Sequence, residues 1–263
     1  MDLPGLSPYA FHLGPIGVHW YGILMVAGML VGIYYMLKNG AKYGLDADFV
    51  TNAALVAILG GVIGARLFFV IFNEPQWFWQ DPGQIFRIWQ GGLTSYGGFL
   101  GGVLAAWWYA RSRGVAVNLL ADLAVPGVAV GYMLVRVGNI FNHELLGRHA
   151  AILPGDIRWP AQLVGVAIGL ILLVRHNLVA RRVSLSKIPG YLFWSFMLWY
   201  SVLRGLVEES VRDNPLYLVH YVNPYFGVGL TTMEQLFTPL ILAVTIFMTW
   251  RSLSVTNAER RMN

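Results

Sequence analysis

Residues 131–148 place several side chains that can bind ligands or move protons close together at the end of an apolar segment. The set consists of Arg136, Asn139, Asn142, His143, Glu144 and Arg148. Two further arginines, Arg66 and Arg204, also lie near the ends of apolar segments. Guanidinium groups bind phosphate in bidentate fashion, so this pattern predicts a cationic site for a phosphate group. The alternative is that each arginine only extends to the surface from a helix end.

The composition indicates the class of protein that must position these groups. Of 263 residues, 57% are hydrophobic and 12% are charged, and the mean hydropathy is +0.58. Soluble domains are about one quarter charged. We therefore predict an all-α polytopic membrane protein, with residues 1–263 forming a single integral membrane domain. The sequence has no Cys, which excludes disulfides, thiolate metal sites and a cysteine nucleophile.

About seven transmembrane helices are expected from the apolar segments. Their predicted ranges are 17–37, 50–72, 93–110, 116–139, 160–174, 190–207 and 231–250. Asp122 and Pro126 interrupt the fourth segment, and residues 210–230 are expected to form a long loop. Residues 74–92 alternate aromatic and polar side chains, which predicts an interfacial amphipathic segment that lies flat on the membrane.

The basic residues predict the orientation, because Lys and Arg are enriched in cytoplasmic loops. Most of them follow the first, third, fifth and seventh segments, so we expect the N-terminus outside and the C-terminus in the cytoplasm. Arg66, Arg136 and Arg204 would then all lie toward the outer face. The most abundant phosphate at that depth is the headgroup of a phospholipid. A phospholipid is therefore the expected ligand.

Spacing pairs two of these arginines with neighbours on the same helix face. Asn139 follows Arg136 by three positions, and Glu208 follows Arg204 by four. The second pair can orient a guanidinium or be a structural salt bridge. Glu144 can orient a donor, accept a proton or remain a solvated loop residue.

Four other polar or aromatic residues begin apolar segments on the same predicted face. His19 and Tyr21 begin the first, Tyr96 the third, and Gln235 the last. Each is a candidate for substrate contact, with an aromatic belt or a simple helix start as the alternative. We see no metal-ligand spacing, no nucleotide-binding glycine loop and no Ser-His-Asp arrangement, so neither metal nor cofactor is expected. The net charge of +5 is spread over loops and does not indicate a nucleic-acid partner.

The sequence resembles the bacterial prolipoprotein diacylglyceryl transferase family. The family signature runs approximately Gly-Arg-x-Gly-Asn-Phe-x-Asn-x-Glu-x-x-Gly. Residues 135–147 read Val-Arg-Val-Gly-Asn-Ile-Phe-Asn-His-Glu-Leu-Leu-Gly and match at Arg136, Asn139, Asn142, Glu144 and Gly147. Further similarities lie at His19 to Gly22, Gly64 to Arg66, Gly91 to Gly98, Tyr200 to Glu208, and Met233 to Gln235.

The sequence differs from the family pattern in three motifs. Tyr96 stands where the family often has the histidine proposed as catalytic, and Val135 precedes Arg136 in place of a glycine. Residues 158–165 read Arg-Trp-Pro-Ala-Gln-Leu-Val-Gly and lack the family's Tyr and Glu. A neutral tyrosine is a poor base at pH 7. Tyr96 is therefore expected to position substrate, with Glu144, His143 or the arginine field assisting proton removal.

The resemblance implies transfer of the diacylglyceryl group of phosphatidylglycerol to the lipobox cysteine thiol of a preprolipoprotein, with release of glycerol phosphate. It implies the bacterial cytoplasmic (inner) membrane, an active site toward the outer face, and as partners membrane lipids and the preprolipoprotein signal peptide. The catalytic residues implied are Arg136, Arg204, Tyr96 and Glu144. The substrate-binding residues implied are His19, Tyr21, Arg66, Asn139, Asn142, Gly147, Tyr200, Glu208 and Gln235. A paralogue that binds or transports phospholipid without catalysis is the alternative.

Overall fold

The computed structural model describes residues 5–14, 16–73, 75–87, 92–155, 157–182 and 188–262, most of which are helical. Contacts divide the chain into two compact units. One unit comprises Met1–Tyr35 with Ala121–Asn263, and the other comprises Met36–Leu120. The single membrane domain expected from the sequence stays a prediction.

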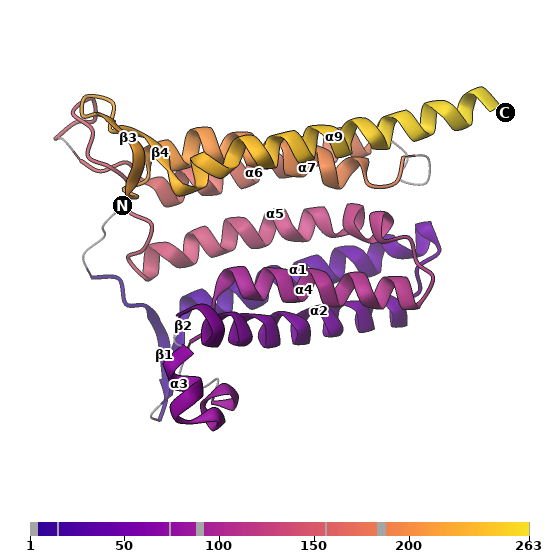
Figure 1. The fold of residues 1–263 in the computed structure, drawn as a ribbon, viewed down its shortest axis with the longest axis horizontal. Helices are drawn as coiled ribbons and strands as arrows, with labels where there is room; N and C mark the ends of the chain where they lie inside the picture. The colour runs from indigo at the N-terminus through magenta and orange to yellow at the C-terminus, as the bar shows by residue number, and fades with distance from the viewer. Residues whose placement is uncertain are drawn as a thin grey trace. The chain divides into compact units, whose positions relative to one another are not determined.

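The unit Met36–Leu120 is built on two helices that run side by side, α2 (Ala47–Phe68) and α4 (Ser95–Ser112) (Figure 1). They meet along glycines: a Cβ added at Gly64 would lie 2.8 Å from the Cα of Gly101. Only residues without a side chain allow backbones to approach this closely. The glycines near Tyr96 therefore pack helix against helix.

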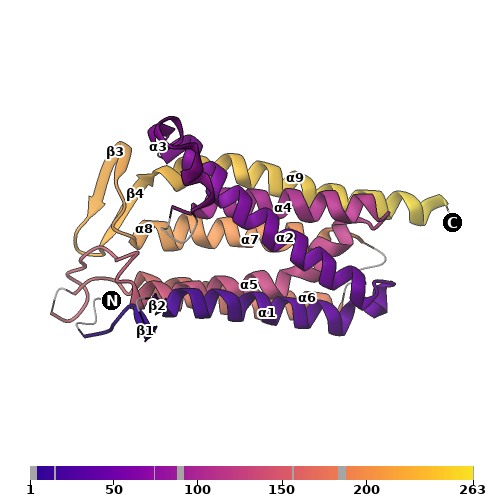
Figure 2. The ribbon, with the colours of Figure 1, turned by 90° about the horizontal axis from the view of Figure 1, so that it is seen from below.

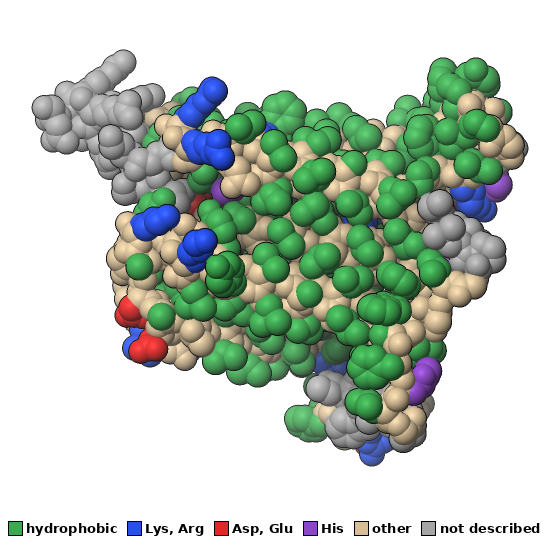
Figure 3. Space-filling view, turned by 180° about the vertical axis from the view of Figure 1, so that it is seen from behind, with side chains coloured by type: hydrophobic (Ala, Val, Ile, Leu, Met, Phe, Trp, Pro, Cys, Tyr) green, Lys and Arg blue, Asp and Glu red, His purple; other side chains and the backbone are tan. Residues whose placement is uncertain are grey.

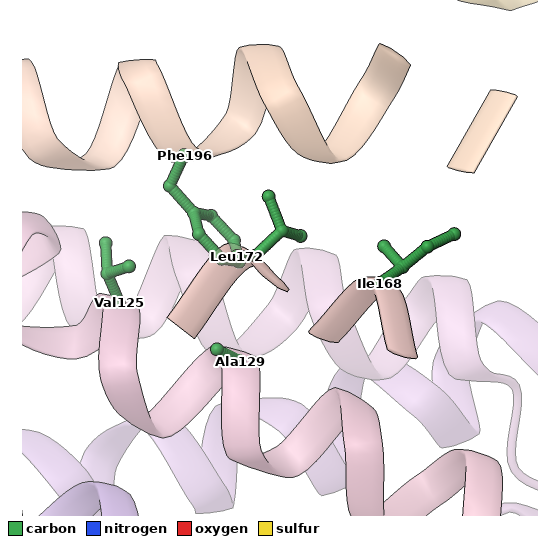
Figure 4. Close-up of a cluster of buried hydrophobic side chains, with 5 residues drawn as sticks. All are labelled: Val125, Ala129, Ile168, Leu172 and Phe196. Carbon is green, nitrogen blue, oxygen red and sulfur yellow. The ribbon is translucent and has the colours of Figure 1, made fainter. Parts of the chain in front are cut away.

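The other unit has its core where α5 (Val117–Phe141), α6 (Ala161–Ala180) and α7 (Tyr191–Val202) meet. Figure 4 shows this core, in which side chains from all three helices converge. The cluster consists of Val125, Ala129, Ile168, Leu172 and Phe196. Helix α1 (Trp20–Gly40) packs against α5, since a Cβ at Gly32 would lie 3.1 Å from the Cα of Gly127. The α5 helix runs unbroken through Asp122 and Pro126, and its polar end is therefore held on a rigid frame.

Among the described residues, five helices are long and apolar enough to cross a membrane. They are Trp20–Tyr43, Ala47–Phe72, Val117–Phe141, Ala161–Ala180 and Met233–Ser254. Figure 3 shows hydrophobic side chains over much of one face, with most of the visible Lys and Arg toward the edges of the view. Leu59 and Leu240, for example, expose 62% and 64% of their surface. Large exposed apolar surfaces of this kind belong in lipid, and the protein is a multi-pass helical membrane protein.

The prediction of seven spans is not supported. Helix α4 covers the third predicted span, but its glycines, its two Trp residues and Arg111 make it less apolar than the other five. In the sixth predicted span, the α-helix α7 ends at Val202 after 12 residues. The backbone continues as a π-helical segment, η5 (Leu203–Glu208), and then as α8 (Glu209–Val211). The fifth predicted span was expected to end at residue 174, but α6 continues to Ala180. Arg175 stays inside this helix and donates to Ser195 Oγ at 2.5 Å.

The mostly helical fold confirms the predicted all-α class, and two short β-hairpins add to the helices. Strands β1 (Tyr9–Leu13) and β2 (Ile16–His19) pair antiparallel before α1. Strands β3 (Leu216–Asn223) and β4 (Val228–Thr232) pair antiparallel within the segment predicted to be a loop, and β4 leads directly into α9 (Met233–Met262) (Figure 2). The β3–β4 turn is favoured locally: Asn223 Oδ1 accepts from the amides of Tyr225 and Phe226, and Gly227 supplies a φ of +60°.

The predicted interfacial segment 74–92 contains two short helices, α3 (Pro75–Gln80) and η3 (Pro82–Phe86). Trp79 and Phe86 expose 80% and 77% of their surface. Residues 74 and 88–91 of this segment lie outside the described residues. A position flat on the membrane stays a prediction.

Candidate functional site

Glu208 joins two arginines from different helices. Its Oε1 lies 2.8 Å from Arg136 Nη2 of α5, and its Oε2 lies 3.3 Å from Arg204 Nη1 of η5. Glu208 is 1% exposed and Arg136 is 7% exposed. Such a pair overcomes its desolvation cost only if further hydrogen bonds satisfy the charges. The predicted pairing of Arg204 with Glu208 is confirmed.

One face of α5 supplies those further contacts. Arg136 Nη1 donates to Asn139 Oδ1 at 3.3 Å, which confirms their predicted proximity. Tyr132, one turn earlier, donates its hydroxyl to Glu208, and its ring lies 4.7 Å from the Arg136 guanidinium carbon. Asn139 Nδ2 in turn donates to Glu144 Oε2 at 3.0 Å. The spacing of three and four residues places Tyr132, Arg136 and Asn139 on one side of α5.

The π-helical segment η5 brings a second carboxylate to the network. Arg204 Nη1 lies 3.1 Å from Glu209 Oε1, and Arg212 Nη1 contacts the same oxygen. Asn214 Nδ2 and Thr232 Oγ1 donate to Glu209 Oε2 at 2.7 and 3.4 Å. Glu209 is 0% exposed. A connected network of charges therefore runs from the exposed Glu144 through Arg136, Glu208 and Arg204 to Arg212.

The chain after α5 is held in place by backbone contacts. Glu144 N donates to Asn139 O at 3.0 Å, and Gln162 Nε2 donates to Glu144 O at 2.6 Å. His143 and Leu145 have positive φ values of 55° and 57°, which non-glycine residues seldom adopt. Strained backbone of this kind is often found at functional sites. Here it accompanies the turn that presents Glu144.

Gly147 and Gln235, both predicted to bind substrate, make contacts within the protein that give each of them a structural role. Gly147 lies against the backbone of Trp159 and forms a β-bridge with Arg212, so a larger residue would not fit. Gln235 Oε1 accepts from Thr232 N at 3.1 Å, while Thr232 Oγ1 accepts from Gln235 N at 3.3 Å. This reciprocal pair is a capping box at the start of α9.

Four more predicted residues lie in the same unit. Tyr200 places its ring 5.3 Å from that of Tyr132, and Asn142 Nδ2 lies 3.5 Å from Glu144 Oε1. Tyr21 packs against Gly138, which directly precedes Asn139 in α5. His19 is exposed and contacts the ring of Tyr9, with centroids 4.4 Å apart, so the structure does not bring it to the network.

Arg66 and Tyr96 belong to the other compact unit. Arg66 is 3% exposed and donates to the carbonyl oxygens of Ile85 at 3.1 Å and Gly92 at 2.9 Å. These bonds fasten the segment after α2 and use donors that were expected to face a phosphate. Tyr96 is 71% exposed on the first turn of α4. Gly91, the first residue of its motif, lies outside the described residues.

Sequence reasoning missed five polar members of the network: Tyr132, Glu209, Arg212, Asn214 and Thr232. Tyr132 was detectable, because it precedes Arg136 by one helical turn. Arg212 was assigned to a loop, although it is 7% exposed and stands three residues after Glu209. No local pattern predicts the π-helical turn that brings Glu209 to Arg204. Thr232 was recognisable as the first residue of a capping box.

The fold and the site together define a multi-pass helical membrane protein with a buried arginine–carboxylate network. Residues 8–251 match the family model described as prolipoprotein diacylglyceryl transferase. The chain belongs to this family and is a diacylglyceryl transferase.

Curated relatives match along nearly the whole chain. A phosphatidylglycerol–prolipoprotein diacylglyceryl transferase of Caldanaerobacter subterraneus subsp. tengcongensis is 51% identical, over 98% of this chain and 99% of its own length. The protein of the same name from Thermoanaerobacter sp. is 47% identical with the same coverage. The one from Thermus thermophilus is 31% identical over 95% of this chain and 99% of its own length.

Proposed function

We propose that this chain transfers the diacylglyceryl group of phosphatidylglycerol to the thiol of a lipobox cysteine in a preprolipoprotein signal peptide. The thiolate sulfur attacks the glyceryl carbon bonded to the phosphate oxygen. A sulfur–carbon bond forms, the carbon–oxygen bond breaks, and glycerol phosphate leaves. The thiol proton passes to a base. The names of the relatives support the substrates, and the joining of Arg136 and Arg204 through Glu208 is the observation that carries the chemistry.

The charge balance of the network suits a phosphate leaving group. Around Glu208 and Glu209, Arg136, Arg204 and Arg212 supply three positive charges against two carboxylates, while the third carboxylate, Glu144, is exposed at the end of the network. One positive charge remains in excess in a buried setting, where it stabilises an anion strongly. Oriented donors of this kind act most on the charge that develops as the phosphate departs.

Both site arginines retain N–H groups for that anion. A guanidinium has five donors. Both carboxylate contacts of Arg204 use Nη1, so its Nε and Nη2 edge can face a phosphate. Within the described part of the chain, Arg136 Nε is buried and has no hydrogen-bond partner. A phosphate oxygen would satisfy it.

The exposed Glu144 is the group best placed to assist thiol deprotonation. A free cysteine has a pKa of about 8.5, so a base or a positive field is needed near neutral pH. Glu144 Oε2 is oriented by Asn139, whereas the His143 ring bonds to Leu6 O at 3.0 Å. Tyr96 serves to position substrate.

The proposed setting is the bacterial inner membrane, with the active site toward the outer face and the N-terminus outside. If α4 and the α7–η5 segment cross the membrane together with the five longer helices, as we propose, the distribution of Lys and Arg supports this orientation. Because the chain has no Cys, single cysteines report sidedness cleanly. A membrane-impermeant maleimide should label Tyr225→Cys but not Arg113→Cys in intact spheroplasts. The opposite labelling would reverse the orientation.

Complementation tests the function directly. Cells depleted of their own diacylglyceryl transferase should grow when this chain is expressed, and a reporter lipoprotein should show the gel shift of lipidation. A reporter whose lipobox cysteine is replaced by serine is the matched control. In vitro, transfer from labelled phosphatidylglycerol is compared with labelled phosphatidylethanolamine. Binding of lipid without any gel shift or transfer would favour the non-catalytic or transport paralogue.

Substitutions at Arg136 test whether its guanidinium binds the phosphate. Arg136→Ala should abolish transfer, while Arg136→Lys keeps the charge and loses the planar fork. Full activity of Arg136→Ala in the same assay would remove Arg136 from the mechanism.

A further inference from the structure

The backbone of η5 explains why two adjacent carboxylates contact one arginine. Each residue of an α-helix turns the side chain by about 100°, so residues five apart point roughly 140° away from each other. The Glu209 N–H bonds to Arg204 O, which is the i to i+5 hydrogen bond of a π-helix. The wider turn brings Glu209 round to Arg204 without losing Glu208.

Glu209 is then fixed from three sides. Arg212 and Asn214 follow the end of α8, and Thr232 ends β4 directly before α9. The Asn214 and Thr232 bonds hold Oε2, which leaves Oε1 to face Arg204 at 3.1 Å. A carboxylate held this rigidly is suited to holding another side chain still.

Resting on the proposed function, we propose that Glu209 is a positioning residue for the transfer reaction. It does not touch substrate. It holds the Arg204 guanidinium at Nη1, so that the opposite edge of that group faces the departing phosphate. Glu208 is shared with Arg136 and Tyr132 and cannot orient Arg204 by itself. The π-helical turn supplies the second carboxylate.

Glu209→Gln is the main test, because it removes the charge at nearly constant volume. In the purified full-length protein we expect kcat to fall about 10- to 100-fold, as for small misplacements of catalytic groups. The KM for phosphatidylglycerol should change little, since the lost interaction forms in the transition state. Glu234→Gln, an equal charge change beside the capping box, is the control and should keep wild-type kcat.

A charge-balanced double variant separates positioning from neutralisation. If Glu209 served only to neutralise Arg212, then Glu209→Gln with Arg212→Gln would restore wild-type kcat, and the proposal would be overturned. Positioning of Arg204 predicts that kcat stays low in the double variant. Glu209→Asp keeps the charge but withdraws the carboxylate by one methylene, so it should lower kcat several-fold. This variant provides the test if Glu209→Gln does not fold.

The outcomes also separate this role from the function itself. Wild-type kcat in a folded Glu209→Gln or Glu209→Asp protein overturns the Glu209 role alone. A wild-type chain that transfers no diacylglyceryl group overturns the proposed function, and the role of Glu209 with it.

Discussion

Arg136 and Glu208 form an ion pair of 2.8 Å between helix α5 and the π-helical segment that follows α7, in a region almost free of solvent. Each partner is far from the other in sequence. Because the same carboxylate also holds Arg204 and accepts from Tyr132, its loss would affect two helices and two guanidiniums at once. Glu208 is therefore the point at which the stability and the activity of this protein should be most closely linked.

Glu208→Gln should lower both activity and stability. Breaking a buried ion pair by removing one partner typically costs about 3–5 kcal/mol, because the other charge stays buried. We expect kcat to fall at least about tenfold and the thermal midpoint in detergent to drop. Asp213→Asn is the matched control: its partners Arg148 and Arg158 pair with it near solvent, where such pairs contribute about 0–1 kcal/mol. Equal effects of the two variants would contradict this account.

Gly165→Ala should impair catalysis by displacing Arg136. A Cβ at Gly165 would lie 2.7 Å from Arg136 Cδ and 2.8 Å from its Nε. Arg136 is held by Asn139 and Glu208 and cannot yield without losing a contact. We expect transfer of labelled lipid to slow by about 10- to 100-fold. Gly131→Ala adds the same methyl where nothing lies within 4 Å and should be silent; a silent Gly165→Ala would show that Arg136 tolerates displacement.

Tyr96→Phe should retain most of the activity. The exposed Tyr96 on the first turn of α4 is expected to position substrate through its ring, and its hydroxyl is not expected to move a proton. Transfer rates across pH 6–9 for the wild type and the variant provide the measurement. Complete loss of transfer in Tyr96→Phe, with the protein still folded, would assign the hydroxyl a role in proton transfer.

Asp122→Ala should lower stability and leave the chemistry intact. Asp122 is 1% exposed and accepts from Gly190 N and Phe193 N, each at 2.7 Å, so α5 caps the start of α7. Two buried N–H groups would lose their acceptor, at a cost of about 2–4 kcal/mol. Thermal unfolding in detergent should show the loss, while kcat per folded molecule stays unchanged. Asp122→Asn retains an acceptor and should be milder; a selective fall in kcat would instead link Asp122 to the reaction.

Gln235→Ala should affect the start of α9 and not lipid affinity. Loss of the capping box with Thr232 costs about 1 kcal/mol. Gln235→Glu preserves the cap and should behave as wild type. The KM for phosphatidylglycerol distinguishes a capping role from substrate binding. A large rise in this KM for Gln235→Ala, at unchanged stability, would support the substrate-binding role expected from the sequence.

Local patterns predicted the helices of the site and its nearest pairs. The apolar runs indicated membrane helices, and spacings of three and four residues placed Asn139 with Arg136 and Glu208 with Arg204, as the structure confirms. The hairpin β3–β4 was taken for a loop, because a short polar and aromatic segment has no strong period of its own. Arg66 looked like a phosphate ligand, yet its donors go to backbone carbonyls that no spacing could reveal.

By itself, the sequence determined that this is a helical membrane protein of the diacylglyceryl transferase family, because hydropathy and a short signature are properties of neighbouring residues. Only the tertiary structure decided which charges share a carboxylate. The ion pair of Arg136 with Glu208 depends on the packing of α5 against α6 and α7. The contact of Glu209 with Arg204 depends on one turn of π-helix. Both are long-range or conformational outcomes, and the energy of burying a charge makes each of them specific.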